Sequence, residues 1–508
     1  MIVPLAVLLA SAPTMVLPPS GPGGRLSWVA EAVADLLPRS LHELGVPVVD
    51  RAERLRAHES LEIPAHGLTR ATSVRIAEAL GAARIVVGRY QSTGERVELS
   101  LQILDVERGS LSAPILAGGP LDGIQGLLRG LAWDVATAGL TPPGLGRDEF
   151  VAGAPAVPFT ALRALAQGLA APDAATRGRL LRQALAEHPG YDEALLNLGR
   201  LQVEARDSAA AVDTLSSVAP GSPLARSARF LQGVACLDLG RHHEASALFS
   251  RLAVPEPSAA VLNNYGLAVL RAGPGPDGVR ASDLLRRALD LDPRLREVPL
   301  NLGWALFLEG DAEASAFWLQ GVLRQDPSDT HARLALVWAL RKAGRSEEAD
   351  AEWRGLIEVA PAYADLGAPE PQRRLERVIP WERPLELDDE RWGDRQYAAS
   401  HLGRGEKLQE AGDLAGARRE LTQAAYLDPY ADRAHLLLAR VEARQGNRDQ
   451  AASGLRMALW IRDDVAIRLE LMRLLQEMGH QAEARLEAER VLKADATNAE
   501  ARAFLGKK

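Results

Sequence analysis

The feature that most constrains this chain is a pattern of small and large residues that recurs about every 34 residues from residue 158 onward. The pattern has an apolar residue at position 4, small residues at 8, 20 and 27, glycine near 15 and proline at 32. Copies begin at 192, 226, 259, 296, 330, 398, 432 and 465, with a degenerate first copy near 158. Small residues let two helices approach closely, and glycine and proline end helices, so each copy predicts a helical hairpin.

The glycine columns are the most regular part of the pattern. Position 8 is held by Gly199, Gly233, Gly266 and Gly303, and position 15 by Gly240, Gly273, Gly310, Gly344, Gly412, Gly446 and Gly479. With these columns, the array resembles the tetratricopeptide-repeat family. The resemblance implies a mainly α fold, an α-solenoid of about nine helical hairpins, whose concave surface binds other polypeptides.

Composition limits what else the chain can be. Its 508 residues exceed the roughly 250–300 that one core supports, which agrees with an elongated array. A net charge of −8 gives no general reason to bind nucleic acid. The single cysteine, Cys236, rules out an internal disulfide and any site built from several cysteines. No catalytic constellation, cofactor motif or metal-ligand spacing occurs, so we expect no enzyme activity, cofactor or metal.

A small α/β domain with a mixed sheet is predicted ahead of the repeats. Helical periodicity marks Leu26–Leu44, Leu68–Leu80 and Leu121–Ala138, with Thr69 or Thr72 as the candidate cap of the second helix. Alternating or β-branched runs mark Thr14–Pro18, Val46–Val49, Arg84–Tyr90, Val97–Val106 and Ser110–Leu116.

Four short motifs in this domain resemble a bacterial envelope family. They are Val48–Arg51, Ile76–Ala82, Ile85–Gly88 and Leu104–Gly109. The domain is similar to the N-terminal domain of the Tol-system translocation protein and to related domains of the curli secretion channel and a flagellar outer-membrane protein. The resemblance covers about a quarter of the chain and implies assembly and contact in the envelope. The same residues also fit purely structural roles in turns and caps.

The first thirteen residues fit either a secretory signal or an N-terminal strand. Met1–Ala12 is apolar and ends in small residues, as signal peptides do, but it lacks a basic start and is followed directly by Pro13. The apolar run is too short and too rich in proline for a membrane span, which leaves peripheral association with the envelope. We expect a periplasmic or envelope location if the segment is a signal, and a cytoplasmic one otherwise.

The pattern divides the chain into six parts. Two proline-rich linkers separate the α/β domain from the repeats and the repeats from each other, and Trp381 and Trp392 are expected to pack the second linker. The predicted parts are the opening segment 1–13, the α/β domain 14–141, a linker 142–157, the first repeat block 158–361, a linker 362–397 and the second repeat block 398–508.

Candidate binding residues follow from the helical period. At about 100° per residue, positions 2, 5, 6, 9, 12 and 13 of each first helix face the concave surface. Position 6 is asparagine in three repeats, and an amide that both donates and accepts can pair with any peptide backbone. Tryptophans and a basic pair stand at positions 9, 12 and 13. The candidate groove residues are Asn197, Arg200, Asn264, Asn301, Trp304, Trp338, Arg341 and Lys342.

These residues suit an extended peptide or a partner helix with apolar side chains and an acidic group or carboxylate. Alternatives stay open for each. The asparagines could brace neighbouring helices, and the tryptophans could be covered by the linker or by the α/β domain. The basic pair, Arg341 and Lys342, could be a solvated helix end.

The function that this pattern favours is a non-enzymatic protein-interaction scaffold of the bacterial cell envelope. The alternative is a sensor, in which the α/β domain binds a small molecule and the repeats relay its state to a protein partner.

Overall fold

The computed structural model describes residues 12–22, 26–61, 63, 68–139, 144–254, 256–273, 278–364, 374–382, 390–429 and 431–506. The chain forms two compact units. Unit 1 comprises residues 1–260 and 380–387, and unit 2 comprises residues 261–379 and 388–508. The first thirteen residues were expected to be a signal or a strand, and 1–11 of them lie outside the described residues.

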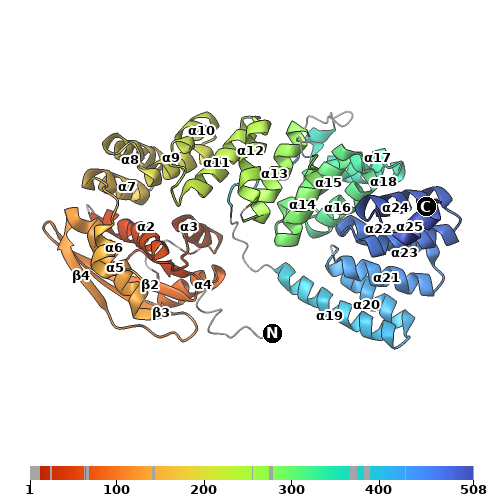
Figure 1. Ribbon diagram of the computed structural model, residues 1–508, viewed down its shortest axis with the longest axis horizontal. Coiled ribbons are helices and arrows are strands. Elements are labelled where there is room, and N and C mark those ends of the chain that lie inside the picture. Colours follow the sequence, from red (N-terminus) through yellow and green to blue (C-terminus); the bar gives the residue numbers. More distant parts are fainter. Residues whose placement is uncertain are drawn as a thin grey trace. The chain divides into compact units, whose positions relative to one another are not determined.

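Unit 1 begins with the predicted α/β domain, built on a four-stranded mixed sheet in the order β1-β2-β3-β4 (Figure 1). The strands are β1 (Thr14–Val16), β2 (Arg84–Thr93), β3 (Arg96–Asp105) and β4 (Ile115–Pro120). β1 pairs parallel to β2, and the other two neighbouring pairs are antiparallel. Gly94, with a φ of 65°, makes the tight connection between β2 and β3.

Helices cover both faces of the sheet. Because successive strand residues point to opposite faces, neighbouring residues of β2 belong to different cores. Val86 belongs to a core shared with α2 (Trp28–Glu43) and α5 (Ile124–Gly139). Its neighbour Ile85 belongs to a second core shared with α3 (Arg51–Ser60) and α4 (Arg70–Ala79). The short helix α6 (Arg147–Ala152) follows α5.

Three sequence expectations for this domain need correction. Helix α3 was not predicted; Asp50 and Glu53 form a capping box that starts it, although its residues are too polar to show a clear apolar period. The run at Val46–Val49 forms only a single bridge to Thr14 instead of a strand. The last strand, β4, begins at Ile115 instead of Ser110, since Leu111 makes only one bridge to Leu104.

The remainder of the described chain is a series of antiparallel helix pairs, which confirms the helical solenoid (Figure 1). Unit 1 holds the pairs α7 (Phe159–Ala170)/α8 (Ala174–Glu187), α9 (Asp192–Glu204)/α10 (Ser208–Ser216) and α11 (Ala225–Asp238)/α12 (His242–Ala253). Nearly all of the rest belong to unit 2: α13 (Ala259–Ala272)/α14 (Ala281–Leu291), α15 (Glu297–Glu309)/α16 (Ala312–Gln325), α17 (Thr330–Lys342)/α18 (Ser346–Val359), α19 (Glu390–Glu410)/α20 (Leu414–Leu427), α21 (Asp432–Arg444)/α22 (Arg448–Ile461) and α23 (Val465–Glu477)/α24 (Gln481–Ala494). Helix α25 (Ala499–Leu505) ends the described chain.

The residue columns explain this regularity. All seven glycines at position 15 have positive φ, as required where a first helix ends and the chain reverses. In the second repeat Arg206 takes this place with a φ of 59°. Glycine at position 8 leaves room for the neighbouring helix, because a Cβ on Gly303 would lie 2.7 Å from Leu319 Cγ. The first helices start within one residue of the predicted repeat starts, except α19, which begins at Glu390 instead of residue 398.

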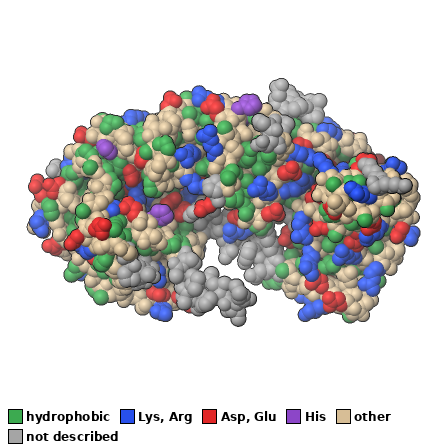
Figure 2. All heavy atoms as spheres, viewed as in Figure 1, with side chains coloured by type: hydrophobic (Ala, Val, Ile, Leu, Met, Phe, Trp, Pro, Cys, Tyr) green, Lys and Arg blue, Asp and Glu red, His purple; other side chains and the backbone are tan. Residues whose placement is uncertain are grey.

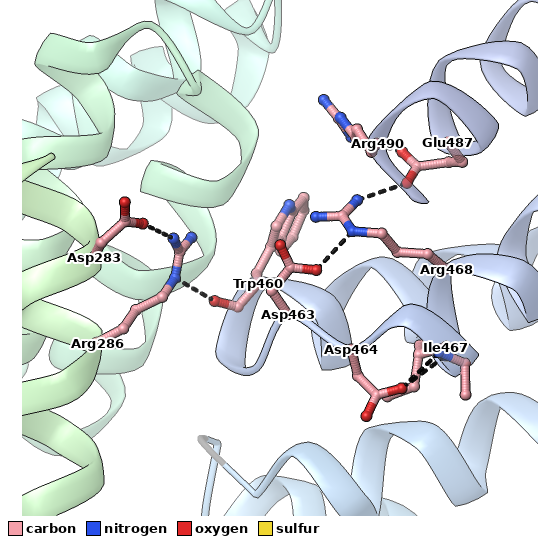
Figure 3. Close-up of polar contacts among 10 residues, drawn as sticks. Asp283, Arg286, Trp460, Asp463, Asp464, Ile467, Arg468, Glu487 and Arg490 are labelled. Carbon is pink, nitrogen blue, oxygen red and sulfur yellow. Dashed lines mark hydrogen bonds and ion pairs between the residues drawn. The ribbon is translucent and has the colours of Figure 1, made fainter. Parts of the chain in front are cut away.

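Within unit 2, the second repeat block packs on the first through α16 and α22. Phe317 lies between two aromatic rings of the second block, with centroid distances of 5.4 Å to Trp460 and 5.8 Å to His435. Arg286 of α14 donates from Nε to the Trp460 carbonyl at 3.4 Å (Figure 3). Burial lowers the pKa of Arg286. Beside this contact, Arg468 pairs with Asp463 and Glu487 and so fixes the start of α23.

None of the helices in the described ranges combines the length and the apolar content that a bilayer crossing requires.

Candidate functional site

Residues 374–379, here called the strap, lie against the first helices of three successive repeats in unit 2. We call the surface formed by α13, α15 and α17 the strap face. Asn301 of α15 donates from Nδ2 to the carbonyl of Arg377 at 2.8 Å and accepts the amide of Arg377 on Oδ1 at 2.7 Å. Asn264 of α13 makes the same pair of bonds with Ile379, at 2.8 and 3.0 Å. Both asparagines therefore recognise main-chain atoms.

The spacing of these contacts matches an extended chain. Two residues of extended chain advance by roughly 6.6 Å and place their main-chain groups on the same side. Arg377 and Ile379 are two residues apart and pair with asparagines one repeat apart, so each repeat receives two residues of the strap. The strap runs opposite to the order of the repeats, since the earlier strap residue pairs with the later repeat.

Asn263, next to Asn264, links the two main-chain contacts. Its Nδ2 donates to Asn264 Oδ1 at 3.1 Å and to the Arg377 carbonyl at 3.3 Å, and its Oδ1 accepts from Asn301 at 2.8 Å. The three asparagine side chains are fully buried. A buried amide costs free energy unless its hydrogen bonds are made, so this network depends on the strap being in place.

Two ion pairs hold the strap side chains in a fixed order. Glu376 accepts from both Nε and Nη2 of Arg271 at 2.6 and 2.5 Å, and the two side chains are only 7% and 12% exposed. Arg377 donates to Asp329 Oδ2 at 2.8 Å. Asp329 is itself held in position, because its Oδ1 accepts the Ala332 amide and so caps α17.

An apolar side chain is buried near each end of the strap. Leu375 and Ile379 are each 1% exposed. Leu375 belongs to a core cluster with Trp304 and Trp338, which are 0% and 2% exposed. The expectation that the two tryptophans are exposed in an open groove is therefore wrong, and the alternative that the linker covers them is confirmed. Their indole N–H groups have no hydrogen-bond partner among the described residues.

The basic pair at the end of α17 contacts aromatic rings of the repeats. Lys342 donates to the carbonyl of Phe307 at 3.2 Å and lies over its ring. Arg341 pairs with Asp350 at 3.8 Å and lies over the ring of Trp353. Their role in binding a partner stays a prediction.

The two remaining predicted residues belong to unit 1. Asn197 donates to the carbonyl of Glu193 in its own helix at 2.8 Å, so this bond braces no neighbouring helix. Arg200 lies 5.7 Å from the ring of Trp381, and Arg56 lies 4.7 Å from the same ring. Burial lowers the pKa of both arginines. The linker thus packs through Trp381, as expected, while the side chain of Trp392 lies outside the described residues.

Sequence reasoning missed three residues that contact the strap. Asn263 and Arg271 occupy positions 5 and 13 of their repeat, which the helical period already places on the concave side. Asp329 precedes its repeat and could be expected only as a helix cap. The strap itself also carried a signal, because Leu375 and Ile379 are apolar residues beside charged ones within a proline-rich linker.

Among the residues that the structure describes, neither the charges on the face shown nor the clustering of metal-ligating side chains marks a second candidate site. On the face shown in Figure 2, Lys and Arg side chains are interleaved with Asp and Glu, as expected for a solvated surface. Within the described ranges, no three His, Cys, Asp or Glu side chains come together as metal ligands would. Cys236 is buried, and burial raises the pKa of its thiol to about 11, which keeps it protonated and unreactive.

The family comparison finds the repeat in two segments of the chain. Two sequence models described as tetratricopeptide repeat match residues 164–232 and 280–330. No curated protein matches the chain. Among solved structures, YrrB, titled a TPR protein with an unusual peptide-binding site, is 17% identical. The match covers 36% of this chain and 94% of that one, with a TM-score of 0.31. The TPR domain of P58(IPK) is 16% identical over 68% of this chain and 96% of that one, with a TM-score of 0.20.

A third solved structure is the C-terminal part of a TPR repeat-containing protein from Cytophaga hutchinsonii. It is 10% identical, covers 61% of this chain and 99% of that one, and has a TM-score of 0.26. The described helix pairs form a solenoid of the tetratricopeptide-repeat type, preceded by a small mixed-sheet domain, and the family models match two segments of this solenoid.

Proposed function

We propose that this protein is a non-enzymatic scaffold and that its strap face binds extended polypeptide segments of partner proteins. Tetratricopeptide-repeat proteins generally act as protein-interaction scaffolds. The observation that carries the proposal for this chain is the pairing of Asn264 and Asn301 with both main-chain groups of a strap residue. Main-chain pairing does not depend on side chains, so a foreign extended segment can make the same bonds.

The strap then acts as an intramolecular occupant of the binding site. A tethered segment has an effective concentration in about the millimolar range, so an external segment of equal affinity cannot displace it at micromolar concentrations. A partner must therefore bind through additional contacts, or the strap must first be released. This property distinguishes the chain from a repeat array with an open groove.

A direct test uses the full-length chain with the strap disengaged by Leu375→Asp and Ile379→Asp. Both substitutions place a charge in a buried position, which favours release of the strap. A fluorescent peptide of residues 374–380 should bind this variant saturably, with a Kd of about 1–100 μM, and should bind the unmodified chain far more weakly.

The matched controls separate the strap face from the rest of the array. Adding Asn264→Ala and Asn301→Ala should abolish peptide binding, whereas adding Asn197→Ala should leave it unchanged, because Asn197 bonds only within its own helix. The milder pair Leu375→Ala and Ile379→Ala serves if the aspartate variant does not fold. Absence of saturable binding to either folded variant would refute the proposal.

A place in the bacterial periplasm or envelope is the second part of the proposal. Its support is the apolar segment Met1–Ala12 and the motifs that resemble envelope domains. Fractionation of the source cells, with mass spectrometry of the mature N-terminus, tests it. Recovery of the full-length, uncleaved chain in the cytosol would contradict it.

A further inference from the structure

Resting on the proposed function, a more specific inference concerns which segments the strap face accepts. We propose that it selects extended segments with the order apolar, acidic, basic, any residue, apolar, the order that Leu375–Ile379 presents. The main-chain pairs with Asn264 and Asn301 fix the register of an occupant. Once the register is fixed, each side chain meets a particular neighbour, and those neighbours decide which sequence fits.

The two apolar positions are set by buried surroundings. Leu375 lies in the cluster with Trp304 and Trp338, and Ile379 is equally buried beside the asparagine network. Burying a leucine or isoleucine side chain contributes about 1.5–3 kcal/mol, and a charge in the same place would be desolvated without a partner. Val378, just before the second apolar position, is half-buried and its side chain has no polar group, so this position accepts many residues.

The acidic and basic positions are set by charges that the strap face presents in a fixed order. Arg271 of α13 faces the acidic position, and Asp329 at the start of α17 faces the basic one. Asp329 is 2% exposed and held by the α17 cap, so it cannot turn away from an occupant. A segment with the two charges exchanged would place like charges together in poorly solvated surroundings, which is strongly unfavourable.

The occupant that these features favour is an extended segment of a different protein with this charge order. Charge complementarity supports this occupant, because the strap face presents one cation, Arg271, and one anion, Asp329, at neighbouring positions of a fixed register. Exchange of the strap between two copies of this chain is the competing outcome. It would make the unmodified protein a dimer that the Leu375→Asp and Ile379→Asp substitutions dissociate, whereas we expect the two forms to have the same mass by light scattering.

The test compares peptides on the strap-disengaged full-length chain. A peptide of residues 374–380 should bind about a hundredfold more tightly than the same peptide carrying Glu376→Arg, since that change opposes two cations at a poorly solvated position. When the chain also carries Arg271→Glu, the preference should reverse, so that the Glu376→Arg peptide binds better. Arg271→Gln is the matched control, for which the preference should shrink without reversing.

The possible outcomes are distinguishable. If both peptides bind saturably and with equal affinity to the chain that retains Arg271, the selectivity is wrong and the proposed function stands. If neither peptide binds any folded form, the proposed function fails as well. Strap exchange in a dimer of the unmodified protein would overturn the assignment of the occupant to a different protein.

Discussion

Asn301 and Arg377, 76 residues apart in the sequence, exchange two hydrogen bonds through one side-chain amide and one peptide unit. The bond lengths of 2.8 and 2.7 Å are those of well-formed hydrogen bonds. This amide therefore replaces the neighbouring strand that an extended chain would otherwise need. The strap is bound as a peptide ligand would be, although it is part of the same chain.

Replacing Asn301 by alanine should loosen the strap without unfolding the repeats. The substitution removes both bonds to Arg377 and leaves the buried Asn263 with one partner fewer, at a cost of about 1–3 kcal/mol. Because each 1.4 kcal/mol is a factor of ten, the Arg377 amide should exchange with solvent about ten- to a hundredfold faster. Hydrogen exchange followed by mass spectrometry on peptides covering 374–379 measures this change.

Asn197→Ala provides the comparison, since Asn197 holds the same repeat position but does not bond to the strap. Its exchange rates over 374–379 should match those of the unmodified chain. Equal rates in the Asn301→Ala variant as well would mean that the asparagine pairs do not hold the strap.

The ion pair between Arg271 and Glu376 should show measurable coupling. Both side chains are poorly exposed, so alanine at either position leaves the other charge without its main partner. In a double-mutant cycle followed by urea unfolding, we expect a favourable coupling free energy of at least about 1 kcal/mol. The pair Arg473 and Glu500 has the same 2.5 Å contact but is exposed, and its coupling should stay within about 0.5 kcal/mol. Coupling free energies of similar size for the two pairs would mean that burial does not strengthen the ion pair between Arg271 and Glu376.

The repeats could be predicted from the sequence because each hairpin depends on local residue types. Glycine is required where φ is positive, as at Gly240, and where helices touch, as at Gly303. These requirements recur about every 34 residues and therefore produce a periodic pattern of residue types in the sequence. Part of the mixed sheet was predictable for the same reason, since a strand such as β3 alternates buried residues with more exposed ones.

The strap could not be predicted because its contacts are made between residues far apart in the sequence. Nothing near Asn264 indicates that its partner is Ile379, 115 residues away. The asparagines pointed correctly to main-chain recognition, but the origin of that main chain was left open. The exposure of the tryptophans was left open for a related reason, because it depends on what packs on the surface, and here Leu375 packs in their cluster.

Unfolding should become easier at mildly acidic pH because of His435. This side chain is buried, and burial lowers its pKa below 6.5; Arg324 acts in the same direction, whereas the Pro429 carbonyl, Asp428 and Asp432 oppose the shift. The folded state therefore prefers the neutral ring, whose Nε2 lies 2.9 Å from the Pro429 carbonyl. The stability from this group is fully present above pH 6.5 and is lost as pH falls from 6.5 towards the folded-state pKa.

Thermal unfolding between pH 7.5 and 5.5 checks the effect of His435. The unmodified chain should lose up to about 1.4 kcal/mol per pH unit from this residue, a loss that His435→Gln should not show. Identical pH profiles for the two proteins would show that His435 titrates freely in the folded state.

Gly303→Ala should destabilise unit 2 by about 1–3 kcal/mol. Helix propensity alone favours alanine by about 1 kcal/mol, but the new Cβ would lie 2.7 Å from Leu319 Cγ in a close helix pair. Overpacking therefore outweighs propensity. Gly190→Ala is the control, because nothing lies within 4 Å of its added Cβ. Urea unfolding of both variants tests the expectation, which fails if Gly303→Ala is as stable as the control.

Arg206→Gly should stabilise unit 1. Arg206 holds the turn position that glycine occupies in seven other repeats, and its φ of 59° is unfavourable for a residue with a Cβ. Its ion pair with Asp238 offsets little of this strain, because the arginine side chain is 81% exposed. Arg206→Ala removes the same ion pair but keeps the Cβ, so the difference between the two variants isolates the backbone strain. In urea unfolding, the glycine variant should be more stable than the alanine variant by about 1 kcal/mol, because only glycine adopts this turn without strain. Equal stability of the two would mean that the turn relaxes at no cost when its side chain is shortened.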